Sequence, residues 1–219
     1  MRPSLRVRLL RRLGIFPRGL RRSSVRAPEH IKYPPLANND VEKRILATIS
    51  EAVRKNEIFR GVPVTDGRML RLLVESTGAT RVLEIGTSTG ISALWLLLGL
   101  SATGGHLTTL EIDAQRAALA RAHFRQAGVD SLVTLVEGDA RRSIADLQGP
   151  LDIVFVDCGV GGDAAILERT LTLLRPGGLF VVHHVVRALD LVEIITANPA
   201  HDTVFYMQGR GLSVTLKKH

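Results

Sequence analysis

The chain has little that could form disulfides, stack nucleobases or cross a bilayer. Cys158 is its single cysteine, which excludes an internal disulfide and fits a reducing compartment, so we expect a cytoplasmic location. Aromatic residues make up 4% of the 219 positions, which leaves no stacking platform for nucleobases. The longest apolar run, ISALWLLLGL, is shorter than the roughly 18 residues that a membrane span needs.

Acidic residues are nearly absent from the first 30 positions. Nine arginines and one acid, Glu29, lie there, so the tail accounts for the net charge of +8 and the remainder is neutral. A neutral remainder has no obvious basic patch for a phosphate backbone, and we expect no nucleic-acid partner. The apolar residues of the tail share one helical face: Leu5, Leu9, Leu13 and Phe16. A transit peptide, a basic helix on an anionic membrane and a disordered arm all remain open.

We therefore divide the chain into a basic tail, 1–30, and a domain, 31–219. Two helices should open the domain, one after Asp40 as its cap and one from about Thr65, as its N-cap, to Ser76. Short apolar runs then alternate with helical segments. The expected strands are 81–85, 106–112, 132–138, 151–157 and 179–184; the expected helices are 91–100, 114–127, 140–147, 163–174 (stopped by RPGG) and 187–196.

The last part of the chain breaks this alternation. Two strand-like runs, HDTVFYMQ and LSVTLKKH, are joined by GRG, which predicts an antiparallel hairpin. Repeated strand–helix units predict a doubly wound, Rossmann-like α/β fold with a seven-stranded, mostly parallel sheet, preceded by the two N-terminal helices. Ligands of such folds bind at the carboxyl ends of the strands.

A glycine loop follows the first strand in VLEIGTSTG, where Gly86 turns the chain and Gly90 allows a close backbone approach at the start of a helix. Glu111 closes the second strand, where a carboxylate can accept both hydroxyls of an adenosine ribose. Asp139, in EGDA after the third strand, should lie near the adenine edge. The alternative is that Glu84 and Glu111 are only charges at exposed strand ends.

These motifs, together with FVD and RPGG, resemble the class I S-adenosylmethionine-dependent methyltransferases over about residues 38–219. The closer resemblance is to the cation-dependent O-methyltransferases of the catechol and caffeoyl-CoA type, family 3. It implies S-adenosylmethionine as cofactor and methyl transfer to a hydroxyl of a small molecule. It assigns cofactor contacts to Glu84, Gly86, Ser88, Gly90, Ser92, Glu111, Asp139 and Asp157.

The same resemblance places Asp157, His183 and His184 where family members hold a divalent cation with two aspartates and an asparagine. A carboxylate with two imidazoles suits Mn²⁺, Fe²⁺ or Zn²⁺ better than the oxygen-preferring Mg²⁺. Neighbours in a strand point to opposite faces, so both histidines converge only if the chain bends there. In the alternative arrangement, one histidine packs against a helix while the other hydrogen-bonds to Asp157.

A lysine is missing where family members have the base that deprotonates the acceptor hydroxyl. Val160 stands at that position, and no lysine lies between Lys55 and Lys217. A bound cation could lower the hydroxyl pKa, or His183 or His184 could act as the catalytic base. Cys158 is better explained as a small packing residue than as a nucleophile, because no partner base is evident.

The sequence thus predicts an S-adenosylmethionine-dependent O-methyltransferase that acts on a small molecule with a divalent cation. One alternative is a non-catalytic protein that binds S-adenosylmethionine through a degenerate site. A second is a nicotinamide-dependent oxidoreductase, against which the missing third glycine of the dinucleotide fingerprint counts. Membrane contact through residues 1–30 and a homodimer stay open.

Overall fold

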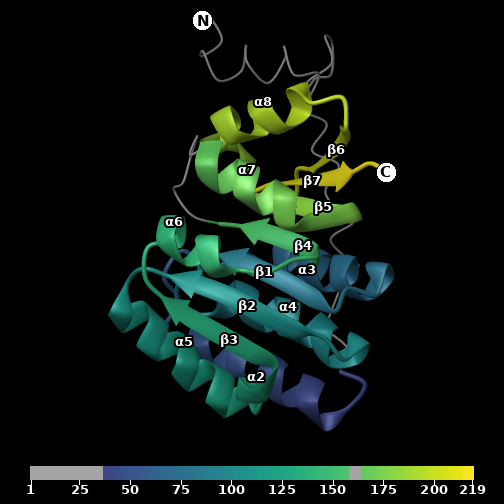
Figure 1. Cartoon of the computed structure of the whole chain (residues 1–219). Coiled ribbons are helices and arrows are strands. Elements are labelled where there is room, and N and C mark those ends of the chain that lie inside the picture. Colours follow the sequence, from purple (N-terminus) through teal and green to yellow (C-terminus); the bar gives the residue numbers. More distant parts are fainter. Residues whose placement is uncertain (1–36, 158–163) are drawn as a thin grey trace, which may run out of the picture. The chain divides into compact units, whose positions relative to one another are not determined.

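The computed structural model describes residues 37–157 and 164–219. Seven strands form one sheet in the order β3-β2-β1-β4-β5-β7-β6, which Figure 1 shows from β3 at one edge to β6 at the other. The strands are β1 Arg81–Ile85, β2 His106–Glu111, β3 Val133–Glu137, β4 Leu151–Val156, β5 Leu174–His183, β6 His201–Tyr206 and β7 Leu212–Lys217. β1 to β5 pair in parallel, and β7 pairs antiparallel with both β5 and β6. The predicted sheet and its closing hairpin are confirmed.

Helices cover both faces of the sheet because the strand side chains alternate between two apolar cores. Val82 packs with α2, α3, α4 and α5, whereas the next residue, Leu83, packs with α7 and α8. The helices are α2 Asp40–Arg54, α3 Val64–Thr77, α4 Ile91–Thr103, α5 Ala114–Ala127, α6 Ala140–Ser143, α7 Ala164–Leu173 and α8 Leu189–Ala197. α4 is buried along most of its length, as the run ISALWLLLGL predicts. Over the described ranges, no helix has the length and apolarity to cross a bilayer.

Two predicted helix starts and one predicted strand start differ in the structure. Asn39, not Asp40, caps α2, because its side chain accepts a hydrogen bond from the Glu42 N–H. Thr65 lies inside α3, which begins after Pro63 without a side-chain cap. RPGG does not precede β5 but belongs to it, since Leu174 already pairs with Leu151 of β4. The pairing with β4 resumes at Leu179, so residues 175–178 form an irregularity within this strand.

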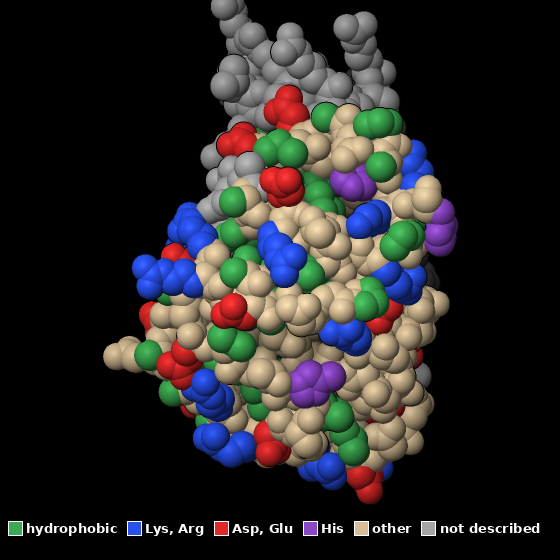
Figure 2. Space-filling model, in the orientation of Figure 1, with side chains coloured by type: hydrophobic (Ala, Val, Ile, Leu, Met, Phe, Trp, Pro, Cys, Tyr) green, Lys and Arg blue, Asp and Glu red, His purple; other side chains and the backbone are tan. Residues whose placement is uncertain are grey.

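The surface agrees with the even charge balance of the domain. On the face drawn in Figure 2, basic and acidic side chains alternate and do not gather into one large patch. The basic tail, residues 1–30, lies outside the described residues, as do Cys158 and Val160.

Candidate active site

A cavity of about 950 Å³ opens at the carboxyl ends of the parallel strands. It has two parts. The loop half is formed at the ends of β1, β2 and β3 by Gly86, Ser88, Glu111, Gly138 and Asp139. The histidine half is formed at the ends of β4 and β5, and by the β6–β7 connection, by Asp157, His183, His184, Arg187 and Arg210. Phe59 and Arg60, which precede α3, also line the cavity.

Glu111 organises the loop half. Its Oε2 accepts a hydrogen bond of 2.6 Å from the Ser88 N–H, and its Oε1 accepts one of 3.0 Å from the Asp113 N–H. Ser88 has a left-handed backbone conformation, with φ of 50°, and its hydroxyl donates to the Phe59 carbonyl at 2.7 Å. A carboxylate fixed through backbone N–H groups keeps lone pairs free for ligand hydroxyls. Glu111 is therefore preorganised to accept two vicinal hydroxyls.

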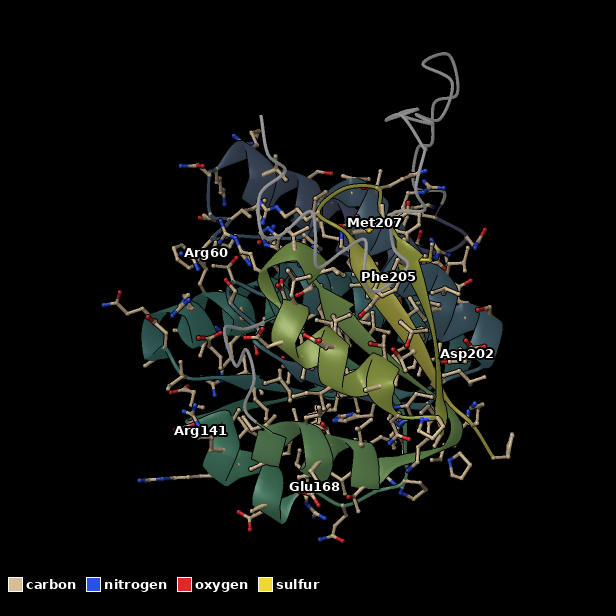
Figure 3. All side chains as sticks on the ribbon, turned by 90° about the horizontal axis from the view of Figure 1, so that it is seen from above. Arg60, Arg141, Glu168, Asp202, Phe205 and Met207 are labelled. Atoms are coloured by element: carbon tan, nitrogen blue, oxygen red, sulfur yellow. The ribbon has the colours of Figure 1, made fainter. Side chains whose placement is uncertain are left out.

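Asp139 ends the loop half on the β3 side. It is the N-cap of α6 and accepts a hydrogen bond of 2.9 Å from the Arg141 N–H. Figure 3 labels Arg141 and Arg60, which lie on the same side of the molecule and line the same cavity. The short helix thus holds Asp139 at the cavity wall, where the sequence predicts a contact with the adenine edge.

Glu84, Gly90 and Ser92 do not line the cavity, although the sequence analysis counts them as cofactor contacts. Glu84 is fully buried behind the loop, where Ser92 Oγ and Thr109 Oγ1 each donate a hydrogen bond of 2.5 Å to it. Burial raises the pKa of Glu84 to about 7, although both hydroxyls oppose the rise. These residues therefore lie behind the loop and support its position.

Gly90 is required by helix packing. Its φ is +86°, and a Cβ at this position would lie 3.0 Å from the ring of Phe124 and 3.2 Å from the Cβ of Ala120, both on α5. A close approach of the backbone therefore occurs here against α5.

His183 lies between two carboxylates at the end of β5. Its Nε2 is 2.9 Å from Asp66 Oδ2 in a hydrogen bond, and its Nδ1 is 2.9 Å from Asp157 Oδ1 as an ion pair without hydrogen-bond alignment. The side chains of His183 and Asp66 are fully buried. Burial alone would lower the pKa of His183, but the two carboxylates outweigh it and raise the pKa to about 9. His183 is thus an imidazolium at neutral pH.

His184 is in the opposite electrostatic state. Its φ is +58°, which ends β5 and bends the chain so that both histidines line the cavity, with ring centroids 5.9 Å apart. Desolvation lowers the pKa of His184, and Arg187, His183 and Arg210 lower it further through their charges. Among the described residues, no hydrogen bond occupies either ring nitrogen. His184 is therefore a neutral imidazole that can accept a proton.

The expected divalent cation does not fit this donor set. A histidine binds a metal through a nitrogen lone pair, so a metal ion would have to displace the ring proton that the two carboxylates stabilise on His183. One oxygen of Asp157 is also engaged with His183. Within residues 37–157 and 164–219, no group of three His, Cys, Asp or Glu side chains is arranged to hold a metal ion. Asp157, His183 and His184 all line the cavity, as their predicted convergence requires. Both ring nitrogens of His183, however, face carboxylates, those of Asp66 and Asp157.

Asp66 is a site residue that the sequence analysis missed. It lies in the first turn of α3, where an acidic residue is ordinarily a helix-end charge in solvent, yet it is fully buried. It also accepts a hydrogen bond of 2.9 Å from the Arg210 N–H. The sequence signal is weak because its partners, at positions 183 and 210, are remote in the chain.

The fold and the strand-end residues define a class I methyltransferase type of α/β protein. A family model described as O-methyltransferase matches residues 37–207, and the chain belongs to this family. It is 37% identical over 127 residues to a catechol O-methyltransferase of Mycobacterium tuberculosis, which covers 58% of this chain and 57% of the relative. The chain thus matches little more than half the length of this relative.

Solved O-methyltransferases have the same fold. The enzyme from Bacillus cereus, in complex with S-adenosylhomocysteine, has a TM-score of 0.69 and 27% identity over 84% of this chain and 93% of its own. TomG from Streptomyces achromogenes, involved in tomaymycin synthesis and solved with S-adenosylmethionine, has a TM-score of 0.68 and 26% identity over 80% and 90% of the two chains. Family membership counts against the oxidoreductase alternative.

Proposed function

We propose that the chain binds S-adenosylmethionine in the loop half of the cavity and transfers its methyl group to a hydroxyl of a small molecule in the histidine half. The observation that carries the proposal is one continuous cavity. It joins Glu111, fixed to accept ribose hydroxyls, to His184, a neutral imidazole without a partner among the described residues. The cofactor-bound relatives support the choice of ligand.

His184 supplies the base that the missing lysine would provide. The acceptor oxygen attacks the methyl carbon, a C–O bond forms as the S–C bond breaks, and the sulfonium electron pair returns to sulfur, leaving a thioether. The acceptor proton passes to the His184 imidazole. Because its pKa is lowered from 6.5, the imidazole is uncharged and able to accept a proton at physiological pH.

His183 acts as a positioning residue. It lies between Asp66 and Asp157, so it fixes the ends of α3, β4 and β5 relative to one another. His183, the residue before His184, is therefore held at both of its ring nitrogens. This arrangement keeps the base in place without a metal ion, and we propose that turnover needs no divalent cation.

The test measures S-adenosylhomocysteine formation by purified protein over a panel of catechols and other vicinal diols. It compares untreated protein, chelator-treated protein, and chelator-treated protein supplied with Mg²⁺, Mn²⁺, Fe²⁺ or Zn²⁺. We expect the turnover rate of the chelator-treated protein to stay within about twofold of the rate of the untreated protein. Turnover that one cation restores after chelation would contradict the metal-free reaction while leaving methyl transfer in place.

A variant separates catalysis from binding. His184→Gln should lose turnover and retain S-adenosylhomocysteine affinity in calorimetry, whereas the matched control His106→Gln, at the opposite end of β2, should keep both. Tight cofactor binding with no turnover on any acceptor would favour the non-catalytic alternative. Absence of cofactor binding would contradict the proposal as a whole.

A further inference from the structure

The arginines in the two halves of the cavity differ in whether a carboxylate lies close to them. In the loop half, Arg116 lies 3.3 Å from Asp113 and 3.6 Å from Glu111, and Arg141 lies 3.7 Å from Asp139. Each guanidinium there has a carboxylate close by. The positive charges of the loop half are therefore balanced before any ligand binds.

Three further arginines line the rest of the cavity: Arg60, Arg187 and Arg210. In the described part of the chain, none of the three forms an ion pair with a carboxylate. The carboxylates of Asp66 and Asp157 each lie 2.9 Å from a ring nitrogen of His183. Arg60 Cζ lies 5.3 Å from the centroid of the Phe59 ring, and Arg187 and Arg210 give the histidine half two guanidinium groups without carboxylate partners in the described ranges.

Two of these arginines are held together by the fold. Arg210 Nη1 donates a hydrogen bond of 3.2 Å to the Arg60 carbonyl, and the Arg210 N–H donates one of 2.9 Å to Asp66. A Cβ on Gly209 would lie 1.9 Å from Asp66 Oδ1, so only glycine permits this approach of the β6–β7 connection to α3. The position of Arg210 is therefore fixed by the same carboxylate that holds His183.

Arg187 follows His184 by three positions. It ends the 3₁₀ turn Val185–Arg187, which begins directly after His184. Arg187 and Arg210 are among the charges that act on the His184 imidazole. Both arginines line the same cavity as His184, so their charges are within reach of a ligand whose hydroxyl faces this base.

An unbalanced cluster of cations in a concave site attracts anions, and guanidinium binds carboxylate and phosphate through paired hydrogen bonds. We propose that the methyl acceptor carries an acidic group, a carboxylate or a phosphate, bound by Arg60, Arg187 and Arg210. The hydroxyl of the same molecule faces His184. The inference rests on the proposed function and narrows its substrate class to hydroxylated acids.

The experiment compares matched probes that differ in one charge. Calorimetry on the full chain, loaded with S-adenosylhomocysteine, measures the affinities of dihydroxybenzoate, its neutral methyl ester and dihydroxyphenyl phosphate. We expect at least one anion to bind about tenfold or more tightly than the ester, with a difference that shrinks as salt rises. The tighter of the two anions identifies the acidic group.

Variants then assign the charge preference to these arginines. The triple replacement of Arg60, Arg187 and Arg210 by glutamine should remove the preference and leave S-adenosylhomocysteine affinity within about twofold. The control Arg54→Gln, on the exposed side of α2, should keep the preference. Equal binding of acid and ester, or a preference that survives the triple replacement, would overturn the inference. If the inference fails in this way, methyl transfer to neutral diols would still support the proposed function. Absence of cofactor binding in the unmodified chain would instead contradict the proposed function itself.

Discussion

The loop half and the histidine half of the cavity differ in how they are built. The loop half comes from consecutive strand ends, and its acid Glu111 is fixed by two backbone N–H groups within 23 positions of it. The histidine half unites α3, β5 and the closing hairpin, and it contains a buried ion pair and arginines without counter-charges. The loop half suits one unvarying cofactor, whereas the histidine half can be adapted to a particular acceptor.

The largest effect should come from breaking the histidine half alone. Asp66→Asn removes one carboxylate from His183, and loss of one partner of a buried pair should cost about 3 kcal/mol of unfolding free energy. The raised pKa of His183 contributes stability that is present below pH 6.5 and lost as the pH rises through about 9. The difference in unfolding free energy between wild type and Asp66→Asn should therefore become smaller as the pH rises from 6.5 to about 9, as measured in denaturant titrations.

The exposed Asp40→Asn serves as the control and should leave the unfolding free energy unchanged within about 0.5 kcal/mol. A gap between wild type and Asp66→Asn that stays constant from pH 6 to pH 10 would show that the carboxylate does not hold the imidazolium.

The second effect concerns the base. His184→Gln should lower kcat by about 100- to 1000-fold, because proton removal by a placed side chain contributes on this scale. In the unmodified protein, kcat should be high above the His184 pKa, which is lowered from 6.5, and fall as the pH drops through it. A kcat profile that is flat from pH 5 to pH 8 would argue against His184.

The third effect should come from a substitution that weakens the loop half alone. Glu111→Gln keeps the shape but loses the charge, and we expect S-adenosylhomocysteine to bind about 30-fold more weakly. Glu137→Gln is a matched control, since Glu137 is the partner of Glu111 in the β2–β3 register but is half exposed. Equal affinities of the two variants would remove Glu111 from the cofactor site.

The smallest effect should be seen at Glu84, behind the loop. Because its folded-state pKa is raised to about 7, stability is lost as the pH rises from 4.5 to about 7. Glu84→Gln should flatten this part of the curve of unfolding free energy against pH and leave kcat within about threefold. A large loss of cofactor affinity in this variant would return Glu84 to the group of contact residues.

Sequence patterns predict the sheet and the acids at the strand ends of the loop half, because both depend on local order. Apolar runs bounded by glycines predict the strands, and acids at successive strand ends meet at one edge of a parallel sheet. RPGG shows the limit of this reasoning: turn-forming residues join β5 because Leu174 pairs with Leu151, a contact that propensity does not contain.

The histidine half could be predicted only in part. The pair at 183–184 is conspicuous, and the bend that lets both rings line the cavity follows from the resemblance. Their chemistry does not, because the charge of His183 depends on Asp66, whose burial no local pattern reveals. The arginines at 60, 187 and 210 likewise come from three separate segments.

The contacts of Asp66 bear on the order in which parts of the chain fold. It joins His183 across 117 positions of the chain and Arg210 across 144, so both contacts close very long loops. Such closures are entropically costly and form late, after the local strand–helix units. We therefore expect the loop half of the cavity to form before the histidine half, which is complete only when the terminal hairpin contacts α3.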